Sequence, residues 1–258
     1  NMALETGAGD PVVVTPLEHP AVAQPLARLA ETGPLGLDQR AEWVKRDGVA
    51  DIEAMAAALT PRTAFTTLIL AHNETGVIQP VGRLVEEARK PGIPTHTDAV
   101  QAVGRIPVDF AALGVETLAF SAHKFHGPAG IGGLLIRRGL TLKPLLFGGG
   151  QQRGIRPGTP PVALAVGMAE ALERAERQGE ARRACWEAQR DRFETVLRQE
   201  LGREAVVRIG PDDPSARLPQ TLNLAFPGLK GELILLGLDL EGVAVSLGSA
   251  CASGAMTP

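Results

Sequence analysis

The sequence contains the run Ser121-Ala122-His123-Lys124-Phe125-His126-Gly127-Pro128, and the run Thr97-Asp98-Ala99-Val100-Gln101 lies about two dozen residues before it. In the first run a lysine stands among hydroxyl and imidazole side chains, which can bind a phosphate group. In the second run a carboxylate lies at the end of an apolar segment. The two runs therefore bring a nucleophilic amine, anion-binding side chains and a carboxylate into one part of the chain.

The sequence around these runs alternates short apolar segments with helical patterns. The apolar segments cover residues 11–15, 64–71, 93–97 and 115–121, and helical patterns cover residues 21–30 and 81–90. Nearly continuous apolar strands that are separated by helices are typical of a parallel sheet covered on both faces. The sequence therefore predicts an α/β fold in which Asn73 and Asp98 lie just past strand ends, where open sheets of this class bind ligands.

The C-terminal third of the chain has a different pattern. Residues 161–201 form one long charged helical pattern, followed by a predicted strand at 221–226, a helix at 231–240 and a further short strand at 243–246. This predicts a large domain over residues 1–175 and a smaller α+β domain over residues 176–258. Because the chain opens with Asn1 and stops at Pro258 just after a run of small residues, we interpret both domains as truncated.

Composition narrows the class of protein. The 258 residues are 44% apolar and carry a formal net charge of -3 with both signs interleaved, so neither a nucleic-acid partner nor an anionic membrane is expected. No apolar run approaches the length of a membrane span, and a cytoplasmic protein is expected. The two cysteines, Cys185 and Cys251, do not indicate a disulfide framework, and no metal site is predicted.

Lys124 and Asp98 indicate a cofactor when they are considered together. A lysine that forms a Schiff base needs an aldehyde to condense with, and a carboxylate beside a pyridinium nitrogen is the usual partner of pyridoxal phosphate. Ser121 and His123 are then placed to hold the phosphate. The alternatives are a solvated lysine in a surface loop and an aspartate that only caps a helix.

Three further polar residues lie near predicted strand ends. His19 could stack on a pyridine ring, Gln101 could donate a hydrogen bond to a ring oxygen, and Asn73 could contact the ring or the substrate. Each has a structural alternative: a structural histidine, a solvated helix residue and a turn. The glycine-rich segment 148–159, with its two arginines and Thr159, suits an anion but also fits a mobile loop.

Cys251 lies among small residues in the run Ser249-Ala250-Cys251-Ala252-Ser253-Gly254-Ala255, which leaves its sulfur accessible. Cys185 lies in the long helical pattern beside Trp186 and is interpreted as inert packing. The sequence therefore indicates Cys251 as the reactive thiol.

Taken in order, these residues closely resemble the cysteine desulfurases, a branch of the class V aminotransferase family with the fold-type I architecture of pyridoxal-phosphate enzymes. The resemblance implies a mostly parallel large domain followed by a smaller α+β C-terminal domain. Two changes from the family pattern, His72 and Pro157, remove no catalytic group. The family's Gly-Thr phosphate loop and its substrate-clamping arginine would lie before Asn1 and beyond Pro258. The matching blocks are residues 18–19, 72–79, 96–104, 121–133, 153–159 and 249–251.

The resemblance also implies roles for the cofactor-binding residues. Lys124 would be the Schiff-base lysine, Asp98 the partner of the ring nitrogen, and His19 the stacking ring. Gln101 would contact the ring oxygen and Asn73 would lie near the substrate. The phosphate would be held by Ser121 and His123, with Thr159 reaching the phosphate of a neighbouring subunit in a homodimer.

In the reaction that the resemblance implies, L-cysteine displaces Lys124, which then removes the α-proton. Cys251 attacks the substrate sulfur and keeps it as a persulfide, while L-alanine is released. The sulfur would pass to an iron-sulfur cluster scaffold, a sulfur-carrier protein or a tRNA thiolation acceptor. Two alternatives remain: another class V aminotransferase or pyridoxal-phosphate lyase, which needs no thiol, and an inactive scaffold for sulfur-transfer partners.

Overall fold

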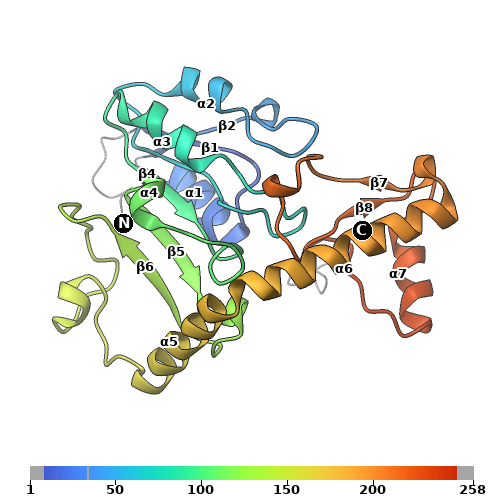
Figure 1. Ribbon diagram of the computed structural model, residues 1–258. Coiled ribbons are helices and arrows are strands. Elements are labelled where there is room, and N and C mark those ends of the chain that lie inside the picture. Colours follow the sequence, from blue (N-terminus) through green and yellow to red (C-terminus); the bar gives the residue numbers. More distant parts are fainter. Residues whose placement is uncertain (1–8, 34, 249–258) are drawn as a thin grey trace.

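The computed structural model describes residues 9–33 and 35–248 and is built around a six-stranded sheet (Figure 1). The strand order is β2-β1-β3-β4-β5-β6, and all neighbours pair in parallel except β5 and β6, which are antiparallel. This confirms the predicted α/β fold with a mostly parallel sheet. The strands are β1 (Asp10–Val14), β2 (Leu35–Gln39), β3 (Phe65–Thr67), β4 (Thr95–Asp98), β5 (Thr117–Ser121) and β6 (Gly132–Ile136).

Both faces of the sheet are covered by helices. Successive side chains of a strand point to opposite faces, and those of β1 enter two different buried clusters. Val13 of β1 belongs to a buried cluster with Met55 of α2 (Ile52–Ala58) and Leu84 of α3 (Val81–Arg89). Its neighbours Val12 and Val14 pack in a second cluster with Leu26 of α1 (Pro20–Thr32). All three valines are at most 1% exposed, and burial of each contributes about 1.5–3 kcal/mol.

The predicted long helix over residues 161–201 is divided at Gln178 into α5 (Val162–Arg177) and α6 (Gly179–Leu201). The interruption coincides with Gly179, a poor helix former. In Figure 1, α6 runs from beside the large sheet to a small antiparallel sheet of β7 (Val207–Arg208) and β8 (Leu224–Ala225). The remaining helices are α4 (Phe110–Leu113) and α7 (Gly231–Leu240).

The helix predicted over residues 231–240 is confirmed with the same bounds as α7. The strand predicted over 221–226 is shorter, since only Leu224–Ala225 pairs with β7. The strand predicted over 243–246 is wrong. Its backbone pairs with no strand among the described residues, and an apolar run needs such pairing to form a strand.

The small sheet is attached to the large one through the loop that follows β3. Leu218 donates its backbone N–H to Gly76 at 2.7 Å, and Ile78 donates to Ala216 at 2.9 Å. Gly76 has a φ of +72°, and a Cβ at this position would lie 2.6 Å from the side chain of Thr221. The contact therefore requires glycine. No helix in the described part of the chain is long and apolar enough to cross a membrane.

Candidate active site

The carboxyl ends of β1, β3, β4 and β5 meet at one edge of the sheet, because these strands are parallel neighbours. β4 ends at Asp98, which lies opposite Ala119 of β5, two residues before Ser121. β1 leads to His19, and the segment after β3 leads to Asn73. This edge is where sheets of this class bind ligands, and it gathers most of the predicted site residues.

Asp98 lies at the centre of this group and is 6% exposed. Its Oδ1 accepts a hydrogen bond from the backbone N–H of Val100 at 2.8 Å. Burial raises the pKa of Asp98, while that hydrogen bond and the nearby positive charges of His19 and Lys124 lower it. The carboxylate therefore caps the following turn and also lies within electrostatic reach of the two predicted catalytic side chains.

Lys124 lies in the short 3₁₀ helix η3 (Ala122–Phe125), directly after β5. It is half-buried, so a fully solvated surface lysine does not describe it. Ser121 Oγ and His123 Nδ1 are 2.8 Å apart and form a hydroxyl and imidazole pair beside the lysine. These groups have the chemistry to bind a phosphate.

Close packing of the backbone fixes η3 in place. Gly104, in the turns after Asp98, has a φ of +77°, and a Cβ there would lie 2.4 Å from the Cβ of Phe125. Gly133 of β6 lies against the ring of Phe120, where an added Cβ would approach to 2.4 Å. Glycine at these two positions allows the Asp98 turns and β6 to pack directly against the segment that carries Lys124.

Glu18 is a buried member of this group that the sequence did not single out. Its Oε1 accepts a hydrogen bond from Thr67 Oγ1 at 3.1 Å, and its Oε2 has no hydrogen-bond partner among the described residues. Burial, together with the charge of Asp98, raises the pKa of Glu18 to about 8. Burial therefore favours the protonated form of Glu18 at neutral pH. In the sequence it belongs to the matching block 18–19, directly before His19, but no role was assigned to it.

His19 and Gln101 both make contacts within the protein. His19 is the N-cap of α1, and its Nδ1 accepts a hydrogen bond from the N–H of Ala21 at 3.1 Å, so a proton on the neutral ring lies on Nε2. Gln101 lies in a series of turns, not on the predicted helix, and its Oε1 accepts a hydrogen bond from Arg105. The amide N–H₂ of Gln101 remains a donor, as its predicted role requires.

Asn73 follows His72 in the loop after β3, and both are half-buried. The Nδ1 of His72 accepts a hydrogen bond from the N–H of Thr75 at 3.2 Å, which closes the turn around Asn73. This explains why histidine can occupy position 72, since the turn requires there only a side chain with a hydrogen-bond acceptor close to the backbone. A Cβ on Gly248 would lie 3.3 Å from Glu74 Oε2, so the last described residue lies beside this turn.

Thr159 is not joined to the rest of the site. It is exposed, and no hydrogen bond links it to Ser121, His123 or Lys124 in the described chain. Cys251 lies outside the described residues. Cys185 lies on α6, as expected, but its side chain is exposed, so the prediction that it is packed is wrong.

The residues at the sheet edge fit pyridoxal phosphate. A buried carboxylate, a half-buried amine and a hydroxyl and imidazole pair match the ring nitrogen, the aldehyde and the phosphate of this cofactor. The fit rests on the chemistry of the groups and on their shared position at the carboxyl edge.

Known proteins resemble this chain in sequence and in fold. The family described as Aminotransferase class-V matches residues 1–258. The cysteine desulfurase of Gluconacetobacter diazotrophicus is 42% identical over 99% of this chain and 63% of its own length. A solved NifS-like protein has a TM-score of 0.82 at 33% identity, covering 92% of this chain and 63% of that one. SspA, solved in complex with cysteine, has a TM-score of 0.79 at 27% identity, covering 100% and 71%.

These matches confirm the fold-type I architecture, and the chain spans about 63% of the length of the curated relative. The family match covers every residue of the chain. The chain therefore belongs to the class V aminotransferase family.

Proposed function

We propose that this chain carries the site of a cysteine desulfurase, which converts L-cysteine to L-alanine and keeps the sulfur as a persulfide on Cys251. One observation carries the proposal: the buried carboxyl of Asp98 lies within electrostatic reach of both Lys124 and His19 at the carboxyl edge of the sheet. The relatives named cysteine desulfurase support the choice of substrate.

Each residue at the edge has a role that its contacts allow. Bound pyridoxal phosphate would act as an electron sink for the substrate's α-carbon. Lys124 Nζ would attach the cofactor through its aldehyde carbon and then accept the α-proton. Asp98 would hold the proton on the ring nitrogen, and Ser121 and His123 would bind the phosphate.

The remaining side chains orient the ring and the substrate. His19 would stack on the ring, with its orientation fixed by the Ala21 hydrogen bond. Gln101 would donate its free N–H₂ to the ring oxygen. Asn73 would contact the substrate from the turn that His72 closes.

The sulfur-transfer step involves no outside oxidant. The thiolate of Cys251 attacks the substrate sulfur, a sulfur-sulfur bond forms and the carbon-sulfur bond breaks, with its electron pair left on the substrate carbon. Protonation of that carbon, together with return of a proton from Lys124 Nζ to the α-carbon, gives L-alanine. The balance is one L-cysteine and one thiol converted to one L-alanine and one persulfide.

The same proposal includes partners and an arrangement of domains. We expect a cytoplasmic homodimer in which Thr159 reaches the neighbouring subunit's phosphate, and an iron-sulfur scaffold, a sulfur-carrier protein or a tRNA thiolation acceptor to receive the sulfur. The division into residues 1–175 and 176–258 is supported by the helix break at Gln178.

Peptide mass mapping after incubation with pyridoxal phosphate and L-cysteine tests the proposal, with one aliquot reduced by borohydride. We expect a pyridoxyl adduct on Lys124 and one added sulfur on Cys251. Cys185→Ser is the matched control, because Cys185 is an exposed thiol on α6. This variant should keep the added sulfur, and Cys251→Ser should lose it.

The other outcomes contradict desulfuration in different ways. An adduct on Lys124 without sulfur on Cys251 would favour an aminotransferase or a lyase. Sulfur on Cys185 alone would show non-specific oxidation of an exposed thiol. The absence of both marks would favour the scaffold.

A further inference from the structure

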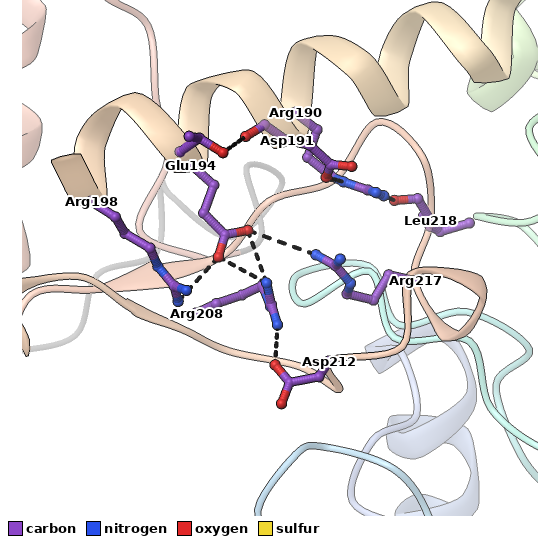
Figure 2. Close-up of polar contacts among 9 residues, drawn as sticks. Arg190, Asp191, Glu194, Arg198, Arg208, Asp212, Arg217 and Leu218 are labelled. Atoms are coloured by element: carbon purple, nitrogen blue, oxygen red, sulfur yellow. Dashed lines mark hydrogen bonds and ion pairs between the residues drawn. The ribbon is translucent and has the colours of Figure 1, made fainter. Parts of the chain in front are cut away.

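A cleft of about 320 Å³ lies against α6 in the smaller part of the molecule, and arginine side chains dominate its lining (Figure 2). We call it the arginine cleft. None of the residues proposed for the cofactor site lines it. Its charged lining residues are Asp191, Glu194, Arg198, Arg203, Arg208 and Arg217.

The carboxylates of the arginine cleft are already engaged. Arg208 Nη1 donates to both oxygens of Glu194, at 2.8 and 3.1 Å, and Arg198 Nη2 lies 3.1 Å from Glu194 Oε1. Asp191 accepts from the Nε of Arg190 at 2.8 Å. Both acids are therefore already paired with other arginines at short distance (Figure 2).

Arg217 is the cation with the poorest compensation. Its side chain is 5% exposed, and its nearest ion pair is with Glu194 at 3.9 Å, beyond hydrogen-bond distance. Its Nε and Nη1 have no hydrogen-bond partner among the described residues, and neither have the Nε atoms of Arg198 and Arg208. Burial lowers the pKa of Arg217, as do the charges of Arg208 and Arg190.

The lining thus has four guanidinium groups against two carboxylates, one of which is paired with Arg190. Asp212, which does not line the cleft, also pairs with Arg208 (Figure 2). Buried guanidinium donors without acceptors are costly, and a negative group between them would satisfy several at once. Guanidinium groups present paired N–H donors that match the oxygens of phosphate. The cleft is also large enough for such a group.

We propose that the arginine cleft is a binding site for a small tetrahedral oxyanion of the phosphate class, held by Arg217, Arg198 and Arg208. The site is separate from the proposed cofactor phosphate site at Ser121 and His123. An anion there would stabilise the junction at which the segment before Leu218 pairs with the loop after β3.

The test follows the midpoint of thermal unfolding as inorganic phosphate is added, with sodium chloride holding the ionic strength constant. Gln199 lines the cleft and is exposed, so Gln199→Glu adds a negative charge there without removing a buried contact. Gln189→Glu makes the same change at another exposed position of α6. Phosphate should raise the midpoint of the wild type and of Q189E along a saturating curve.

For Gln199→Glu we expect about tenfold weaker phosphate binding, because like charges repel across the cleft. Arg217→Met should weaken the response at least as much, whereas Arg192→Met, which removes an exposed arginine of α6, should leave it unchanged. Should Arg217→Met fail to fold, the two glutamine variants still decide. An equal response from Q199E, Q189E and the wild type, or a response that does not saturate, would overturn the proposal.

Discussion

Glu18 makes the stability of the chain depend on pH. Its pKa of about 8 lies above its ordinary value of 4.5, so between these values the folded chain keeps a proton that the unfolded chain releases. The free energy of unfolding therefore falls as the pH rises through this window, by up to about 1.4 kcal/mol per pH unit. Glu18→Gln has no such proton, so we expect its stability to fall less between pH 6.5 and 8 and to exceed that of the wild type at pH 8.

Urea denaturation of the cofactor-free chain at several pH values measures this effect. The window begins at pH 6.5 because His96, whose pKa is lowered by burial to about 4, contributes a slope of the opposite sign below its ordinary value of 6.5. Glu86→Gln, at an exposed position of α3, is the control and should follow the wild type. A wild-type slope in Glu18→Gln would show that Glu18 is ionised in the folded chain.

At the scale of elements, sequence prediction was accurate where the pattern is local. The strand β1 is a short apolar run and the helix α7 a segment bounded by turn residues, while Asp98 ends β4 and Lys124 lies directly after β5. β2 was missed because it is an edge strand that contains Gly36 and Asp38, so its alternation is weak. The raised pKa of Glu18 depends on tertiary burial, which the local sequence pattern does not reveal.

The packing of the Asp98 turns against η3 gives an element-scale prediction. Gly104 and Gly92 both have a φ of +77°, but a Cβ on Gly104 would lie 2.4 Å from Phe125, whereas Gly92 has nothing within 4 Å. Alanine at either position costs about 1–2 kcal/mol from the left-handed backbone, and Gly104→Ala adds about 1–3 kcal/mol of overpacking. Urea denaturation should therefore show a greater loss for Gly104→Ala than for Gly92→Ala. Equal losses would mean that Phe125 moves away without cost.

At the scale of the whole molecule, the proposed homodimer requires an apolar surface. Leu145, Leu146 and Phe147 are consecutive and 62%, 52% and 87% exposed, directly before the segment that carries Thr159. Such a run is typical of a protein interface.

We expect sedimentation velocity to show a dimer for the wild type and about tenfold or more weaker association for Phe147→Ser. Because Thr159 would serve the neighbouring subunit, that variant should also bind pyridoxal phosphate more weakly in a fluorescence titration. Phe193→Ser, at a 54% exposed position of α6, should leave both unchanged. A monomeric wild type, or a Phe147→Ser variant that dimerises normally, would exclude this surface as the interface. The segment that carries Thr159 could then not be brought to a neighbouring subunit by contacts of Phe147.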